Sequence, residues 1–281
     1  MKQVMRWLGT ALGVLVALVI VAYAVVYFLS ERTLRRVYQI PAVAMSIPSD
    51  PASIAEGSRL ATIHGCAGGC HGRGFEGAVM FDDPMVGRIV APNLTAAVRN
   101  YNDSQLVNII RHGLRPDGRS MMVMPSEAFA YLSDEDLGRI IAYLKSVPAV
   151  EGPGPSVSMG PLGRVGLATG KFQPVAELIA STVPPPEATS DEGKYGRYLA
   201  RTTCAGCHGT NLHGDSNPEF TSPSLRVAAA YSPQAFTELM RTGAAIGGRT
   251  LATMGPWART HLSLQTDAEI AALHSYLHTM P

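Results

Sequence analysis

The sequence has four cysteines in two close pairs, and a histidine directly follows the second cysteine of each pair. In the downstream pair, Cys204 and Cys207 are separated by two residues and followed by His208, which is the C-x-x-C-H attachment pattern of c-type haem. This short turn presents two thiols to the vinyl groups on one porphyrin edge and an imidazole to the iron. A zinc site would need two further ligands, and a thioredoxin-type pair would not require the histidine. We therefore predict a covalently bound haem at this motif.

The upstream pair departs from the pattern by one residue, because three residues separate Cys66 from Cys70 before His71. Such a pair alone would also fit a disulfide or a redox-active pair. Both motifs, however, continue with a glycine, and a second glycine follows five residues later, at Gly77 and Gly214. The extra residue falls in a Gly-Gly step, where the backbone can bulge without strain. We therefore predict a second haem at Cys66, Cys70 and His71.

The chain repeats itself at offsets of 130 and 133 residues, which indicates two copies of one domain. Each copy is predicted to contain a helix before the cysteines, a middle helix ended by glycine and a capped last helix. We see no convincing alternating strand pattern, so we expect a mainly α fold. The middle helices are predicted at 103–112 and 233–242, and the last helices at 133–146 and 266–279.

A methionine at the same place in each copy is a candidate axial ligand of the iron. Met124 follows His71 by 53 residues, and Met254 follows His208 by 46 residues. Most methionines fill cores, and the two at 121–122 compete with Met124. The offset of 130 favours Met124, as does the proline that follows it. His/Met ligation would fill both axial positions and raise the potential relative to two histidines.

An uncharged apolar run of 23 residues extends from Trp7 to Leu29, long enough for a helix to cross a bilayer. Aromatic side chains near its ends resemble interfacial anchors. The alternative is a signal peptide cleaved after residues 22–24, but the apolar run continues beyond that point. We therefore predict a transmembrane anchor within 1–30, followed by a stalk at 31–50.

The composition indicates which kinds of partner to expect and where the domains and their linker lie. Only 16% of the residues are charged and the net charge is +1, so nucleic acid is not an expected partner. Residues 1–49 hold five Lys or Arg and one acidic residue, so most of the positive excess flanks the apolar run. A Pro- and Gly-rich linker at 149–186, with a short helix near 174–181, is long enough to wrap a domain. The two predicted domains are 51–148 and 187–281.

Each copy resembles a small class I c-type cytochrome. The first copy carries the runs PNLT, RHG, MP and LSDED, which begin at residues 92, 111, 124 and 132. It is similar to the haem domains of multihaem cytochrome c subunits of membrane-bound bacterial dehydrogenases for alcohols, aldehydes and sugar acids. Those subunits usually carry three haems, whereas this sequence has two attachment motifs. The resemblance implies tandem class I cytochrome c domains with His71, Met124, His208 and Met254 as the axial ligands.

Two six-coordinate haems would leave no open iron position for a substrate, so we expect an electron-transfer protein rather than an enzyme. Haem is attached covalently outside the bacterial cytoplasm, which predicts periplasmic haem domains tethered to the inner membrane. The expected donor is a dehydrogenase or a quinol-oxidising complex, and the expected acceptor is a terminal oxidase or a soluble cytochrome of the respiratory chain. The alternative is a dihaem cytochrome c peroxidase, in which one iron would lose its sixth ligand. A haem-based sensor is a third class, but no signalling segment follows the haem motifs.

Overall fold

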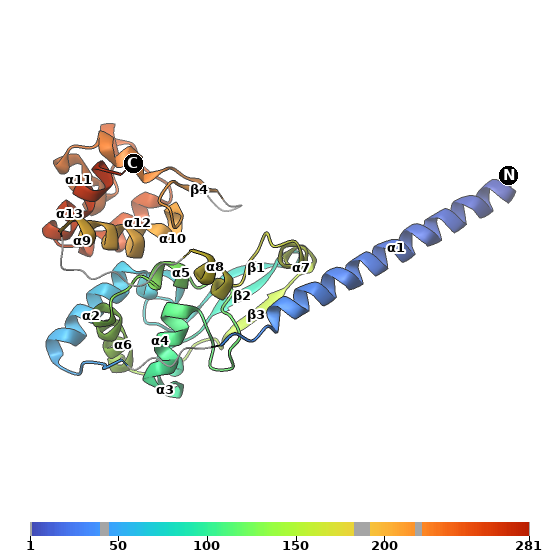
Figure 1. Ribbon diagram of the computed structural model, residues 1–281, viewed down its shortest axis with the longest axis horizontal. Helices are drawn as coiled ribbons and strands as arrows, with labels where there is room; N and C mark the ends of the chain where they lie inside the picture. Colours follow the sequence, from blue (N-terminus) through green and yellow to red (C-terminus); the bar gives the residue numbers. More distant parts are fainter. Residues whose placement is uncertain (1, 40–44, 183–191, 217–220, 281) are drawn as a thin grey trace.

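The computed structural model describes residues 2–39, 45–182, 192–216 and 221–280. A single long helix, α1 (Lys2–Leu34), projects away from two globular parts that lie side by side (Figure 1). By length and composition α1 could cross a membrane, and its most apolar stretch is not covered by any other described part of the chain. The helix continues four residues into the segment expected as a stalk.

Most helices of the first domain begin at side-chain caps. The Asp50 carboxylate accepts the Ser53 N–H before α2, and the Ser133 hydroxyl accepts the Asp136 N–H before α6, so each satisfies an otherwise unpaired donor. The predicted middle helix is confirmed as α4, which ends at Gly113 in a left-handed conformation. The helical elements are α2 (Pro51–Ile63), η1 (Cys66–Cys70), α3 (Leu94–Asn100), α4 (Asp103–His112), α5 (Ser126–Phe129) and α6 (Asp134–Ser146).

The second domain repeats this plan. Arg241 pairs with Asp267 at 2.6 Å, just as Arg111 pairs with Asp134 at 2.7 Å in the first domain. In both domains this ion pair ties the end of the middle helix to the start of the last helix. The elements are α9 (Glu192–Leu199), η2 (Ala200–Cys204), α10 (Ala205–His208), η3 (Leu225–Ala230), α11 (Pro233–Thr242), η4 (Ile246–Gly248), α12 (Met254–Thr260), η5 (Leu262–Leu264) and α13 (Asp267–His278).

The described residues also form a three-stranded antiparallel sheet, which the sequence does not predict. Strand β2 (Gly87–Ala91) lies between β1 (Ala78–Asp83) and β3 (Ser156–Met159). The alternation of apolar and polar residues that would indicate strands is weak here, because the strands are short and β1 ends in two aspartates. A second, two-stranded ladder joins β4 (Asp215–Ser216) to β5 (Thr221–Ser222).

The described part of the connector between the domains, residues 149–182, is folded rather than an extended linker. It contributes β3, then α7 (Pro161–Ala168), which packs against α1, and α8 (Val175–Thr182), which packs against α4 and α5. The short helix expected near 174–181 is therefore confirmed as α8. Because β3 completes the sheet of the first domain, the connector belongs structurally to that domain (Figure 1).

In each domain the first and last helices cross at a glycine. A Cβ on Gly57 of α2 would lie 1.9 Å from the carbonyl oxygen of Arg139 in α6. A Cβ on Gly196 of α9 would lie 2.2 Å from the carbonyl oxygen of Ala272 in α13. The backbones of the paired helices therefore approach more closely than any side chain permits.

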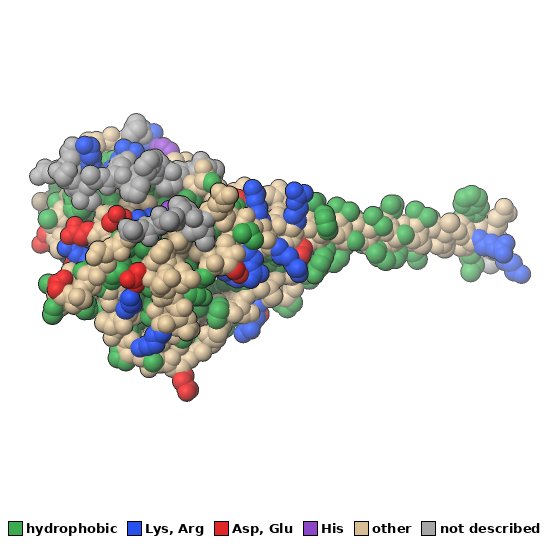
Figure 2. Space-filling model, turned by 60° about the horizontal axis from the view of Figure 1, so that its bottom comes forward, with side chains coloured by type: hydrophobic (Ala, Val, Ile, Leu, Met, Phe, Trp, Pro, Cys, Tyr) green, Lys and Arg blue, Asp and Glu red, His purple; other side chains and the backbone are tan. Residues whose placement is uncertain are grey.

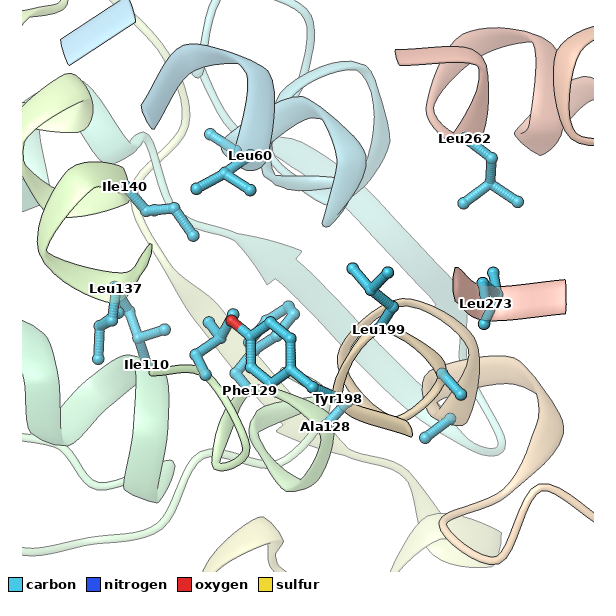
Figure 3. Close-up of a cluster of buried hydrophobic side chains, with 14 of the residues drawn as sticks. Leu60, Ile110, Ala128, Phe129, Leu137, Ile140, Tyr198, Leu199, Leu262 and Leu273 are labelled. Carbon is cyan, nitrogen blue, oxygen red and sulfur yellow. The ribbon is translucent and has the colours of Figure 1, made fainter. Parts of the chain in front are cut away.

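The apolar cores of the two domains meet in one continuous cluster. Phe129 and Leu60 of the first domain belong to the same buried cluster as Tyr198 and Leu199 of the second (Figure 3). Leu137 is fully buried at the centre of the first domain. The two domains are therefore expected to resist separation, because separation would expose apolar surface.

We predict that Gly57→Ala destabilises the protein by about 1–3 kcal/mol, because the added methyl group must push α2 away from α6. The Gly166→Ala change in α7 is a matched control, since its Cβ would meet its nearest neighbour at 3.4 Å, an ordinary contact. Urea unfolding of both haem-loaded variants, followed by circular dichroism, measures the difference. Equal stability of the two variants would contradict the close helix crossing.

Candidate functional site

The second cysteine motif is a helical turn that fixes the ring of His208. The ring Nδ1 lies 2.9 Å from the carbonyl oxygen of Pro223, and Gly214 N–H donates to the His208 carbonyl at 2.9 Å. A carbonyl oxygen only accepts, so Nδ1 carries the proton and Nε2 keeps its lone pair. The side chain is thus held in the tautomer that a metal requires.

The first motif holds His71 in the same way. Its Nδ1 donates to the Pro92 carbonyl at 2.9 Å, and Gly77 N–H donates to the His71 carbonyl at 2.8 Å. Both histidines are 9% exposed, and burial lowers the pKa of each below the usual 6.5. A neutral imidazole with a free Nε2 is the form that binds iron. The two motifs therefore share one arrangement around the ring despite their different spacing.

The extra residue of the first motif is absorbed by the backbone between the cysteines. Gly68 has φ 69° in the left-handed region, and Gly69 has φ −112° and ψ −114°, so η1 is not a regular helical turn. The second motif is regular, since α10 begins directly after Cys204. The bulge predicted at the Gly-Gly step is thereby confirmed.

All four cysteines lie in the described chain as free thiols. Burial raises the pKa of Cys66 to about 12 and of Cys204 to about 11, and it also raises the pKa of Cys70 and Cys207. A redox-active or nucleophilic pair needs the opposite shift, toward the thiolate. The surroundings therefore argue against a redox-active pair at Cys66 and Cys70.

The two candidate methionines occupy equivalent places. Met124 lies two residues before the short helix α5, and Met254 is the first residue of α12. Both are partly buried against the core. Each follows a loop closed by an isolated β-bridge, and the two bridges, Leu114↔Ser120 and Ala244↔Thr250, are related by the offset of 130.

Because the two bridges occupy equivalent places in the repeat, Met124 is a better counterpart of Met254 than the methionines at 121–122 are. The donor set of each domain then comprises two thiols, an imidazole of fixed tautomer and a thioether. These are the groups that hold a c-type haem, so the residues present fit that cofactor.

The first motif is covered by two aromatic side chains of the second domain. A Cβ on Gly65 would lie 2.4 Å from a Trp257 ring carbon, and a Cβ on Gly69 would lie 3.5 Å from the same ring. The Trp257 and His261 rings are tilted by 32° with their centroids 3.8 Å apart, and His261 Nδ1 donates to the Thr62 carbonyl at 2.7 Å. The unusual glycine-rich motif therefore forms part of the contact between the domains.

Polar contacts surround this aromatic contact. Arg59 of α2 makes two 2.8 Å hydrogen bonds to the carboxylate of Glu269 in α13. His64 Nδ1 lies 3.1 Å from the Thr202 carbonyl, so a histidine of each domain contacts the backbone of the other. The Tyr198 hydroxyl donates to Asp136. These contacts bring the two attachment motifs toward each other.

The contact residues of the second domain are not predicted from the sequence. One signal was available for Trp257, because residue 127 at the repeat offset of 130 is a glutamate. A large aromatic residue that breaks an internal repeat is expected where the two copies differ in their surroundings. No comparable signal marks Arg59, because its role depends on a tertiary contact. Pro92 opens the PNLT run noted above, but the run does not reveal that the proline carbonyl holds the histidine ring.

The two halves of the chain match two families. Residues 52–144 match the family described as cytochrome c oxidase, cbb3-type, subunit III, and residues 193–281 match the family described as cytochrome c. Both matches agree with the domain repeat seen in the fold. The chain therefore carries two cytochrome c domains in tandem.

Curated relatives cover most of the chain. The chain is 26% identical over 258 residues to the fructose dehydrogenase cytochrome subunit of Gluconobacter japonicus, covering 82% of this chain and 53% of the relative. It is 24% identical over 279 residues to the cytochrome c subunit of the alcohol dehydrogenase (quinone) of Gluconacetobacter polyoxogenes. This match covers 85% of this chain and 58% of the relative. The same figures hold for the subunit of that name in Komagataeibacter europaeus. The chain thus spans a little over half the length of these relatives.

We predict that Gly65→Ala weakens the contact between the domains more than backbone strain alone explains. Gly65 has φ 72°, where a side chain is strained, and its Cβ would also collide with Trp257. Gly170→Ala is a matched control, since Gly170 has φ 70° but open space around its Cβ. The control should lose about 1–2 kcal/mol from strain. Gly65→Ala should lose more and shift the tryptophan fluorescence, and equal effects would contradict the packing of Trp257 on the motif.

We predict that His261 makes stability fall as the pH drops below about 6.5, the ordinary histidine value. Burial lowers the pKa of His261, so below that pH the unfolded chain binds a proton that the folded chain does not. His261→Gln keeps a donor for the Thr62 carbonyl but does not titrate. The free energy of unfolding of this variant should therefore change less between pH 7 and about 5. Urea midpoints across this range measure the effect, with His213→Gln at an exposed ring as the control. An unchanged slope in His261→Gln would contradict the assignment.

Proposed function

We propose that this chain, a tandem of two cytochrome c domains, is a membrane-tethered electron carrier with two covalently bound haem c groups. The observation that carries the proposal is the imidazole arrangement found twice, in which Nδ1 is held by a proline carbonyl and Nε2 is left for iron. The haem-binding units we propose are residues 51–148 and 187–281.

The residues assigned to each haem follow from the two motifs. Cys66 and Cys70 attach the first haem, with His71 and Met124 as its axial ligands. In the second domain, Cys204 and Cys207 attach the haem, and the axial ligands are His208 and Met254. When bound, each haem supplies a one-electron ferric/ferrous couple.

The protein supplies the orientation and the surroundings of the couple. The proline carbonyls hold the histidine rings in place, and the buried core beside each motif excludes water. A thioether ligand raises the potential relative to a second imidazole. With both axial positions filled by side chains, the chain would carry electrons and leave substrate chemistry to a partner. The names of the relatives are those of cytochrome subunits and give no support to the peroxidase alternative.

The α1 helix is proposed to anchor the chain in the bacterial inner membrane, with both haem domains in the periplasm. A tether raises the effective concentration of the domains near membrane partners. The relatives are cytochrome subunits of dehydrogenases, so the favoured electron donor is a membrane-associated dehydrogenase. A quinol-oxidising complex remains the second donor class, and a terminal oxidase or a soluble cytochrome would accept the electrons.

The test is the spectrum and redox titration of the purified oxidised protein. We expect two low-spin haems, each with the weak far-red charge-transfer band of a methionine–iron bond. Met124→Leu should remove about half of that band and turn one haem high-spin, whereas Met122→Leu, the matched control at a buried rival, should keep both bands. Loss of the band in Met122→Leu alone would overturn the assignment of Met124. A high-spin haem that binds peroxide in the unmodified protein would instead favour the peroxidase.

A further inference from the structure

A concave basic site lies where α1 meets the first domain. Four arginines line it, from the end of α1, from the loop after α4 and from α7: Arg35, Arg115, Arg119 and Arg164. Its volume is about 450 Å³. Figure 2 shows blue side chains gathered at this junction, next to the green apolar surface of α1. We refer to these four side chains as the arginine pocket.

The arginine pocket is held in a fixed position relative to the helix. Arg164 donates to the Ser30 hydroxyl at 2.9 Å and to Glu31 at 3.0 Å, and its guanidinium lies 4.1 Å from the Tyr27 ring centroid. Arg36 pairs with Glu177 of α8 at 2.8 Å. The end of α1 is therefore joined to the connector by several directional contacts, so the pocket moves with the helix.

Positive charge is in excess at the arginine pocket. Glu31 pairs with both Arg35 and Arg164, and Asp117 pairs with Arg119. Within the described part of the chain, Arg115 makes no side-chain ion pair. Four guanidinium groups thus face two carboxylates, which gives the site a net charge of +2.

The arginine pocket lies at the outer edge of the lipid headgroup region if α1 spans a bilayer. The apolar run ends at Leu29, and Arg35 follows six residues later, or about 9 Å along the helix. The headgroup region extends about 5–8 Å beyond the hydrocarbon core on each side. Leu34 and Met122 add apolar surface to the pocket wall. The site therefore combines guanidinium groups with an apolar surface that leads toward the membrane interior.

We propose that the arginine pocket binds the phosphate of an anionic phospholipid, whose acyl chains lie along the exposed apolar surface of α1. Guanidinium groups bind phosphate oxygens in a bidentate manner, and a net negative headgroup would balance the charge excess. A lipid bound in this way fixes the tilt of the haem domains over the membrane. The inference rests on the proposed function in one respect, namely that α1 anchors the chain.

The test uses the full haem-loaded chain, delipidated in a neutral detergent and titrated with fluorescent phosphatidylglycerol or phosphatidylcholine. Arg35→Gln with Arg115→Gln removes two charges and spares Arg164, which holds the helix. Arg226→Gln with Arg249→Gln is the control of equal charge, at exposed positions in the second domain. One basic residue near an anionic surface contributes about a fivefold change in affinity, so the pocket variant, which lacks two, should bind phosphatidylglycerol roughly 25-fold more weakly.

Selective binding of phosphatidylglycerol that the pocket variant loses and the control keeps would support the site. Equal binding of both lipids, or equal loss in both variants, would overturn it. Displacement of phosphatidylglycerol by millimolar inorganic phosphate would overturn the lipid as the ligand and identify a free-anion site. Recovery of the native chain in the soluble fraction after carbonate washing of membranes would overturn the anchor itself, which distinguishes failure of the proposed function from failure of the pocket alone.

Discussion

A hydrogen bond from an imidazole Nδ1–H to a proline carbonyl, made once in each domain, is the contact on which the rest of the structure depends. It sets which nitrogen of His71 and His208 is available to a metal, and it requires a returning loop that places Pro92 or Pro223 beside the ring. The helix that leads into each motif is in turn held in place by its close crossing with the last helix of the domain. The same crossing appears twice, so one solution to the packing problem is used in both domains.

The two domains are not independent units joined by a tether. The glycine-rich bulge of the first motif is covered by Trp257, and His261 is bonded to the backbone of the partner domain. The segment with the unusual cysteine spacing is therefore also a segment through which the two domains contact each other. An inserted residue that would only loosen a solitary cytochrome domain here provides the surface on which the second domain packs. Electron exchange between two centres benefits from such a fixed separation, because its rate depends steeply on distance.

Short-range patterns predict the local parts of this structure well. The cysteine motifs, the middle helices and the capped last helices each depend on residues a few positions apart, and the structure places them where the patterns indicate. The sheet could not be predicted in this way. Strand β3 pairs with a strand about 70 residues earlier, and no strand shows a clear alternation of apolar and polar residues. The domain contact is different for the same reason: Arg59 and Glu269 are far apart in sequence, and a charged residue on a helix face reveals nothing about a distant partner. Pairing across long sequence distances leaves little trace in composition or periodicity.

The position of β3 bears on how the chain matures. In a chain exported from its N-terminus, the first attachment motif emerges well before residues 156–159, so the outer edge of β2 is still unpaired when haem could first be attached. An open strand edge pairs readily with other chains. Closing the sheet with a segment that follows the last helix delays completion of the first domain until the connector has also been translocated. An excised first domain would therefore have to include residues through Met159 to keep its sheet closed.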